Sequence, residues 1–129
     1  MTHLKQSLGP NQILWIEALR SGGYAQGKEV LSRDNKFCCL GVACEIFKDA
    51  LDLEVSPASG SNTITYNGVY GTAPFRVIEH LGLYDDVADA SPGSDGSPLA
   101  HLNDESGYSF LEIADLIEDD PSVYFRSPR

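Results

Sequence analysis

Apolar residues recur at helical spacing in the first clear element of the chain, the stretch NQILWIEALRSGG at residues 11–23. Every third residue from position 13 to position 19 is apolar, and two more apolar residues lie on a flanking face. Asn11 is placed to cap the first turn, and Gly22 suits the left-handed position after the last turn. The pattern predicts a helix with a buried stripe, formed by Ile13, Ile16 and Leu19 with Trp15 and Ala18 beside it.

A second helix is predicted over residues 38–49, where the sequence is apolar on nearly every side. A helix without a polar face is buried in a globular protein. All three cysteines of the chain, Cys38, Cys39 and Cys44, lie in this stretch. We therefore expect this helix at the centre of the core, with its cysteines packed as small apolar side chains.

Two short β-hairpins are predicted from their turn residues. Asp34 and Asn35 lie between the stretches KEVLS and KFCC, and both residue types suit tight turns. Asn67 and Gly68 join ITY to VYG, and this pair favours a type I′ turn. Residues 56–63 read as the loop between the cysteine helix and the second hairpin.

Three further helices complete the prediction. One covers residues 72–82 with Pro74 in its first turn, and a short one covers residues 97–102. The last helix opens with a capping box, Ser109 followed three residues later by Glu112. The pattern thus predicts an α+β fold in a single domain, residues 1–129, with three to four helices packed on the cysteine helix and two hairpins at its edge.

Neither the start of the chain nor its apolar runs are typical of a targeting signal. The opening MTHLKQSLGP has no apolar stretch typical of a secretion signal, and no run approaches the roughly 18 residues that span a bilayer. An odd number of cysteines without such a signal indicates free thiols in a reducing compartment. We expect a cytoplasmic protein that does not act on membranes.

The cysteine spacing, C-C-x4-C, differs from the paired spacing of zinc motifs. On one helix Cys39 and Cys44 would lie about 140° apart, at roughly 100° per residue, so the thiols could not share one ion. The sequence predicts neither a metal site nor a cofactor.

A cysteine nucleophile is the alternative interpretation of the same stretch. A thiol in the first turn of a helix can be stabilised as a thiolate by free N–H groups and the helix dipole. Cys39 precedes His101 and Asn103 in the chain order of papain-like enzymes. The stretch CLGVA is also similar in outline to the catalytic helix of NlpC/P60 peptidases, with Leu40 in place of their serine. This alternative makes Cys39 or Cys38 the nucleophile and His101 and Asn103 its partners.

Polar side chains gather in two turns, one after the first predicted helix and one between the last two. Such residues either cap and close the turns or line one shared pocket. In the second case they form a site for a small ligand or a partner. The candidate binding residues are Arg20, Tyr24, Gln26, Lys28, Asn103, Asp104 and Tyr108.

The formal net charge of −10 is unevenly distributed. Residues 1–40 carry five basic and three acidic side chains, whereas residues 41–129 carry four basic and sixteen acidic ones. No Lys or Arg lies between Arg76 and Arg126, a stretch that holds twelve Asp or Glu residues. Such a field repels phosphate backbones and disfavours direct nucleic-acid binding. The negative charge either keeps the protein soluble or serves for docking on a basic protein partner.

Several stretches together resemble a family of small proteins found in tailed-phage and prophage genomes. The shared patterns are W-x2-ALRSG-x-Y-x-Q, FCCLGV-x-C and LND-x-x-G-x-SF-x-EIAD, in that order. The resemblance is carried by Trp15, Ala18, Leu19, Ser21, Gly22, Tyr24, Gln26, Cys38, Cys39, Leu40, Gly41, Val42, Cys44, Leu102, Asn103, Asp104, Gly107, Ser109, Phe110, Ile113, Ala114 and Asp115. It departs at Gly23 and at Phe75-Arg76. The resemblance implies a phage origin and an accessory role in the infected cell, and it implies no activity.

The sequence therefore favours a non-enzymatic accessory protein that binds a host or phage protein with a basic face. Its motivating feature is the acidic second half of the chain. A cysteine-dependent hydrolase and a small-ligand-binding protein are the alternatives.

Overall fold

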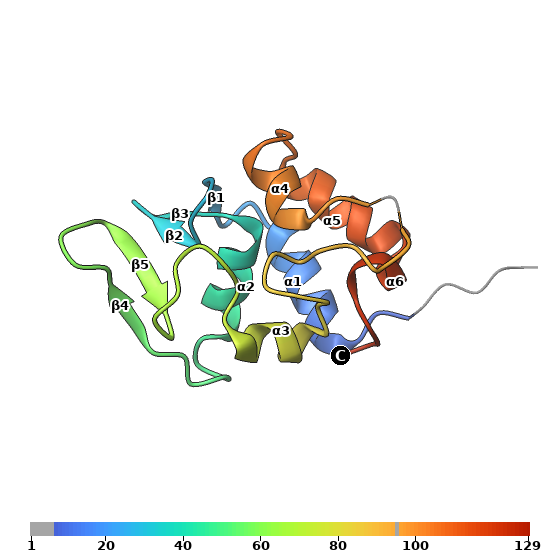
Figure 1. Cartoon of the computed structure of the whole chain (residues 1–129), viewed down its shortest axis with the longest axis horizontal. Helices are drawn as coiled ribbons and strands as arrows, with labels where there is room; N and C mark the ends of the chain where they lie inside the picture. Colours follow the sequence, from blue (N-terminus) through green and yellow to red (C-terminus); the bar gives the residue numbers. More distant parts are fainter. Residues whose placement is uncertain (1–6, 95) are drawn as a thin grey trace, which may run out of the picture.

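The cysteine-containing helix α2 (Cys39–Phe47) lies at the centre of the fold, with helices on one side of it and a small sheet on the other (Figure 1). The computed structural model describes residues 7–94 and 96–129. Over these residues the chain forms an α+β domain of six helices and a five-stranded mixed sheet. The other helices are α1 (Pro10–Arg20), α3 (Phe75–Leu81), α4 (Leu99–Asp104), α5 (Phe110–Asp119) and α6 (Pro121–Tyr124).

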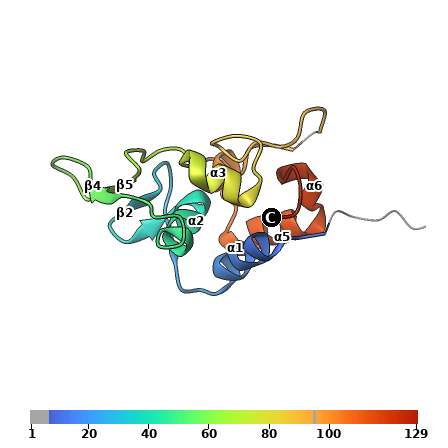
Figure 2. The same cartoon turned by 90° about the horizontal axis from the view of Figure 1, so that it is seen from below.

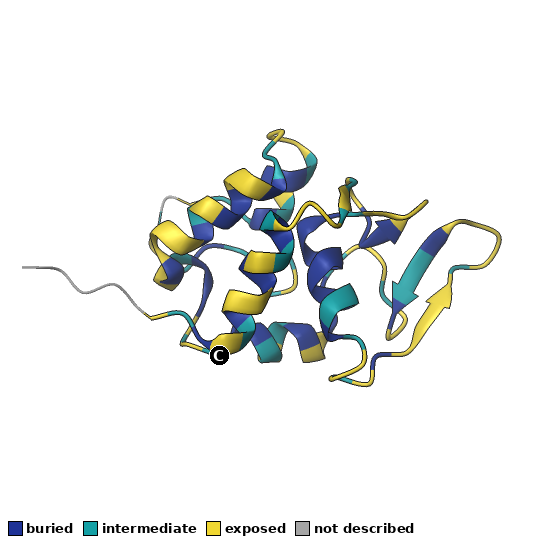
Figure 3. Ribbon diagram, turned by 180° about the vertical axis from the view of Figure 1, so that it is seen from behind, coloured by how far each residue is buried: buried dark blue, intermediate teal, exposed yellow. Residues whose placement is uncertain are grey.

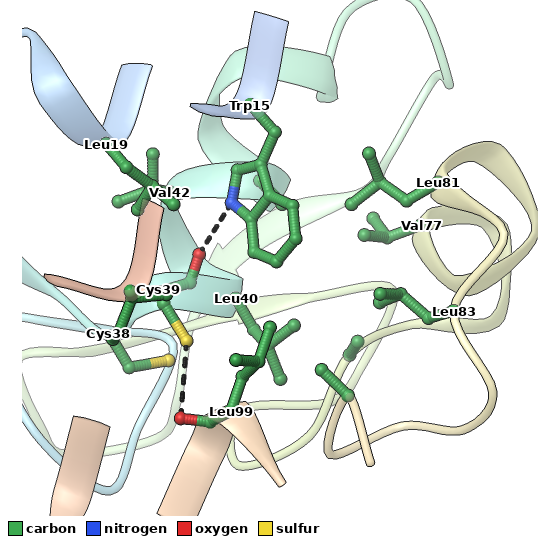
Figure 4. Close-up of a cluster of buried hydrophobic side chains, with 14 of the residues drawn as sticks. Trp15, Leu19, Cys38, Cys39, Leu40, Val42, Val77, Leu81, Leu83 and Leu99 are labelled. Atoms are coloured by element: carbon green, nitrogen blue, oxygen red, sulfur yellow. Dashed lines mark hydrogen bonds between the residues drawn. The ribbon is translucent and has the colours of Figure 1, made fainter. Parts of the chain in front are cut away.

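The prediction of a buried cysteine helix is confirmed. Seven of the nine residues of α2 are buried, and α1, α3 and α4 all pack against it. The indole N–H of Trp15 on α1 donates to the carbonyl of Cys39 at 3.0 Å, inside a cluster of leucine and valine side chains (Figure 4). This bond satisfies the one polar atom of a fully buried tryptophan.

Gly41 lets α2 approach the backbone of Leu31, the residue before strand β2 (Ser32–Arg33). A Cβ atom built on Gly41 would lie 2.6 Å from the carbonyl carbon of Leu31 and nearer still to its oxygen. Side chains of any size are therefore excluded at this position, which holds the helix directly against the chain that leads into β2.

Helix α1 differs from its prediction in two details. It begins at Pro10 with Gly9 as the N-cap, so Asn11 lies inside the helix instead of capping it. Gln12 is buried, whereas Ile13 is 43% exposed. The reason is tertiary, because the Gln12 side-chain amide donates to the carbonyls of Leu81 and Ser127 at 2.8 Å and its Oε1 accepts from the N–H of Gly9 at 2.9 Å.

The two predicted hairpins are parts of one sheet, in the order β1-β3-β2-β5-β4. The first hairpin forms as predicted, and its strand β2 also pairs antiparallel with β5. The short edge strand β1 pairs parallel with β3, a pairing that the sequence did not predict. The remaining strands are β1 (Ala25–Gln26), β3 (Lys36–Phe37), β4 (Val55–Pro57) and β5 (Thr63–Tyr66). The β4–β5 ribbon projects at the end of the molecule farthest from α6 (Figure 2).

The Asn67-Gly68 turn forms, but the hairpin around it is only partly as predicted. Both turn residues have positive φ angles, 52° and 82°, and Tyr66 and Val69 exchange two backbone hydrogen bonds across the turn. Val69 makes an isolated bridge and begins no strand. Strand β5 pairs instead with β4, inside the segment predicted as a loop.

The later helices lie close to their predicted positions. Helix α3 begins at Phe75, three residues later than predicted, with Pro74 as its N-cap instead of in its first turn, and it ends at Leu81 before Gly82, whose φ is 74°. Helix α5 has the predicted capping box, with the Glu112 N–H donating to Ser109 Oγ at 3.1 Å and the Ser109 N–H donating to Glu112 Oε1 at 3.0 Å. Its buried stripe is formed by Phe110, Ile113, Ala114 and Ile117.

Candidate functional site

The three cysteine thiols are buried in the core. Cys39 and Cys44 have no exposed surface, and Cys38 is 5% exposed. Cys38 is the N-cap of α2, and its Sγ accepts from the N–H of Gly41 at 3.4 Å. The Sγ of Cys39 donates to the carbonyl of Leu99 at 3.8 Å, as Figure 4 shows.

Burial also decides the protonation state of these thiols. It raises the pKa of the Cys38 thiol to about 11, which outweighs the opposite effect of the backbone N–H groups at the start of α2. Burial likewise raises the pKa of Cys39 and of Cys44 well above the ordinary value of a cysteine. All three are neutral thiols near pH 7, whereas a nucleophile has to be a thiolate.

His101 and Asn103, the candidate catalytic partners, lie in different surroundings. His101 is on the solvent side of α4, where its Nδ1 lies 2.8 Å from a carboxylate oxygen of Glu105. Leu99 and Leu102 occupy the core side of the same helix and face α2. Asn103 is buried, and both N–H groups of its amide donate to other groups, as described below. Cys39, His101 and Asn103 do not converge on one cleft.

The two polar turns meet at Gln26. Its Nε2 donates to Asn103 Oδ1 and to the carbonyl of Tyr108, both at 2.8 Å, and its Oε1 accepts from the N–H of Phe110 at 3.1 Å. Asn103 Nδ2 donates to the carbonyl of Gly27 at 2.9 Å and to Asp104 Oδ1 at 2.8 Å. We call Gln26 and Asn103 with these bonds the amide clasp, which joins β1 to α4 and to the start of α5.

The amide clasp uses all four amide N–H groups of its two side chains within the protein. Asp104 extends it, because its Oδ1 also accepts from the N–H of Glu29 at 2.9 Å. A network whose buried donors are satisfied rigidifies the segments that it joins. These bonds give Gln26, Asn103 and Asp104 a structural role, and their role as ligand contacts stays a prediction.

Arg20 and Tyr24 make contacts outside the amide clasp. Tyr24 packs edge-on against Phe37, with ring centroids 5.7 Å apart. Arg20 lies beside α5 and pairs with Asp115 at 2.6 Å and Glu118 at 3.1 Å. Lys28 is exposed at the sheet. A shared ligand site of the seven candidates stays a prediction.

The outer side of α5 carries a row of acidic side chains. Asp115 and Glu118 follow Leu111 by four and seven residues, a spacing that places all three on one face of a helix. We call the exposed residues Leu111, Glu112, Asp115, Glu118 and Asp119 the α5 acidic face, which Figure 3 shows as the exposed side of this helix. No Lys or Arg occurs in α5, and Leu111 is 57% exposed.

A cationic surface at the sheet was not recognised from the sequence. Lys28, Arg33 and Lys36 line one hollow, together with Gly27, Val30 and Asp34. The signal was present, since Arg33 and Lys36 flank the predicted two-residue turn and must therefore face each other across the hairpin.

An apolar hollow of about 330 Å³ lies where α1, α2 and α3 meet. It is lined by Leu14, Ile46, Phe47 and His80, with Asn11 and Ala50 at its edge. The His80 ring stands edge-on to Phe47, with centroids 4.5 Å apart, and burial lowers the pKa of its imidazole.

The structure was compared with the requirements of a metal site and of a membrane span, and the sequence with known families. In the described part of the chain, no group of three or more His, Cys, Asp or Glu side chains is arranged to hold a metal ion. No helix among residues 7–94 and 96–129 is long and apolar enough to cross a bilayer. A family model described as a domain of unknown function (DUF8296) matches residues 11–121. No curated protein and no solved structure matches the chain.

Proposed function

Because the chain belongs to the DUF8296 family of domains, whose function is unknown, we propose its function from its surfaces. The protein is a non-enzymatic accessory protein of a phage or prophage, and it binds a host or phage protein through the α5 acidic face. The partner presents a basic face. The encounter takes place in the host cytoplasm, a reducing compartment that suits three free thiols.

The observation that carries the proposal is the composition of the α5 acidic face. Four carboxylates stand on one exposed helix side without a Lys or Arg in the helix, and Leu111 supplies apolar area at the first turn. Interfaces of this kind combine complementary charge, which speeds the encounter, with apolar contact, which holds the complex. Arg20 orients Asp115 and Glu118 without removing the net negative charge of the face.

The buried thiols support a non-enzymatic role. A hydrolase of the papain or NlpC/P60 kind needs a thiolate next to an imidazole at an accessible cleft. Cys38 and Cys39 are neutral and buried, and His101 pairs with Glu105 on the solvent side of α4. The chemistry available at the surface is therefore charge recognition.

The proposal is tested by affinity capture from the lysate of a bacterial host, followed by a binding measurement with each captured protein. Capture is done at low salt, about 50 mM, where exposed charges are least screened, and repeated at about 500 mM. We expect a partner with a basic face whose affinity for the chain falls roughly tenfold or more at the higher salt concentration.

Matched variants assign the binding to its surface. Asp115→Asn combined with Glu118→Gln removes two charges from the α5 acidic face. Asp49→Asn combined with Glu54→Gln removes two exposed charges near the β4–β5 ribbon. The proposal requires the first pair to weaken binding and the second pair to leave it unchanged. Capture of no protein at low salt, or an equal loss with both pairs, contradicts it.

A further inference from the structure

Three cations meet at a hollow of about 120 Å³ on the sheet. Lys28, Arg33 and Lys36 are all exposed and line it together, so one third of the nine Lys and Arg residues of an acidic chain lie at one place. None of the three makes an ion pair with any residue in the described part of the chain. The positive charge of this hollow is therefore not neutralised by a neighbouring carboxylate in contact.

The hairpin forces two of these charges together. Arg33 and Lys36 are directly opposite each other in the antiparallel pairing of β2 with β3, joined by the left-handed residues Asp34 and Asn35. Like charges in this position destabilise a hairpin, whereas an anion bound between them removes the repulsion. The arrangement is unfavourable for the free protein and favourable for an anion complex.

The positions of the cations are fixed by the sheet. The Nε of Arg33 donates to Thr63 Oγ1 at 2.8 Å, which anchors the guanidinium beside β5 through one N–H and leaves its terminal NH2 groups for a ligand. The N–H of Gly27 donates to the carbonyl of Phe37 at 2.7 Å, which holds Lys28 beside the hairpin. A guanidinium in a fixed orientation pairs with two oxygens of a phosphate at once.

A larger hollow of about 480 Å³ adjoins the first one and shares Arg33 and Asp34 with it. Its other lining residues are hydroxyl or amide side chains and one aromatic ring, those of Ser61, Asn62, Thr63 and Tyr70, with Ala58. The Tyr70 side chain is 55% exposed, so its ring is available for stacking. The Asp34 carboxylate is held by Asn62 Nδ2 at 2.7 Å and keeps lone pairs for a hydroxyl group.

These groups describe one class of ligand. Cations next to the small hollow bind a phosphate, the Asp34 carboxylate accepts a hydrogen bond from a sugar hydroxyl, and an exposed tyrosine stacks on a planar ring. We propose that Lys28, Arg33 and Lys36 hold the phosphate of a small nucleotide whose sugar and base lie in the adjoining hollow, with the base against Tyr70.

The overall negative charge selects for a small ligand. At about 0.1 M salt the Debye length is about 10 Å, so carboxylates toward the C-terminal end of α5, which points away from the sheet in Figure 1, act little on an anion at the hairpin. A nucleic-acid strand extends over many such lengths and meets the acidic surfaces as well. A mononucleotide meets the three local cations and, of the carboxylates that line the two hollows, that of Asp34.

The test is a calorimetric or NMR titration of the full chain with AMP, with inorganic phosphate and adenosine as separate probes of the two halves of the ligand. We expect AMP to bind more tightly than either probe. Arg33→Gln should weaken AMP and phosphate binding roughly tenfold or more, the usual effect of losing a charged hydrogen-bond partner. Lys36→Gln should weaken both by a smaller factor. Tyr70→Ala should weaken binding of AMP and leave that of phosphate unchanged.

Arg76→Gln is the matched control, because Arg76 is an exposed arginine outside both hollows and the substitution changes the net charge equally. Thermal unfolding of each variant confirms that it is folded. The inference is overturned if the wild-type chain binds neither AMP nor phosphate at millimolar concentration, or if Arg76→Gln weakens binding as much as Arg33→Gln does. Equal weakening of AMP and phosphate by Tyr70→Ala overturns the assignment of a nucleotide.

Discussion

Gly41→Ala is a severe test of how α2 packs. In an exposed helix this substitution stabilises a protein by about 1 kcal/mol, because alanine has the higher helix propensity. Here the added Cβ would lie 2.6 Å from the carbonyl carbon of Leu31, and the clash is with backbone that cannot rotate away. Overpacking of a core costs about 1–3 kcal/mol and sometimes more, and a backbone clash belongs at the upper end. We expect a net loss of about 2–3 kcal/mol.

The free energy of unfolding is measured by urea titration, followed by the fluorescence of Trp15, the only tryptophan of the chain and fully buried. In a thermal scan the same loss lowers Tm by roughly 10 °C for a domain of this size. An unchanged m-value shows that the variant still unfolds from a compact state.

Gly71→Ala is the matched control. Gly71 is exposed, and a Cβ built on it would have Glu29 O as its nearest neighbour, at 3.9 Å. This variant should stay within about 0.5 kcal/mol of the wild type. The packing argument is refuted if Gly41→Ala unfolds at the same or a higher urea concentration than the wild type does.

Three further predictions concern the amide clasp, an imidazole and the thiols. Gln26→Ala leaves Asn103 Oδ1 and the Phe110 N–H without the partners they have in the amide clasp, and should cost about 2–3 kcal/mol in the same urea titration; a loss below about 0.5 kcal/mol would contradict that role. The lowered pKa of His80 means that the folded state binds this proton less readily than the unfolded state does. The stabilising contribution of neutral His80 is therefore complete above the unfolded pKa of about 6.5 and falls as the pH drops below that value. The substitution His80→Gln should flatten the pH dependence of Tm between about pH 7 and 5. An identical slope in both proteins would refute this. Iodoacetamide at neutral pH should label Cys38, Cys39 and Cys44 of the native protein far more slowly than it labels a free thiol, and it should label all three in urea. Rapid labelling of a cysteine in the native protein would support the hydrolase alternative.

Local sequence signals predicted the elements whose cause is local. The capping box of α5, the Asn67-Gly68 turn and the left-handed Gly22 after α1 all form where expected, because each depends on residues within a few positions. The all-apolar pattern of residues 38–49 was also sufficient to place α2 in the core, since no polar face remained for solvent.

Long-range contacts account for what the sequence did not predict. Gln12 is buried in place of Ile13 because the carbonyls of Leu81 and Ser127, far along the chain, supply its partners. The parallel pairing of β1 with β3 involves strands of two residues, too short to carry a periodic pattern.

The candidate sites show the same division between local and long-range information. The sequence placed Gln26 and Asn103 in two polar turns and left open whether these turns meet, and the structure brings their side chains into direct contact. Composition suggested an acidic surface but could not select the α5 face. The cationic hollow of Lys28, Arg33 and Lys36 required the register of the hairpin and the position of the preceding loop.

The bonds between the beginning and the end of the chain determine when this domain can assemble during synthesis. Helix α1 packs on α5, and the side chain of Gln12 bonds to Ser127, 115 residues later. A nascent chain that has emerged only as far as the sheet has α2 but lacks α3 and α5, which also cover α1, so part of the buried side of α1 stays exposed on the ribosome until those helices appear. Folding of this domain should therefore be complete only after the residues up to Ser127 have been made, and premature termination before α5 should yield a product for proteases rather than a partly active protein.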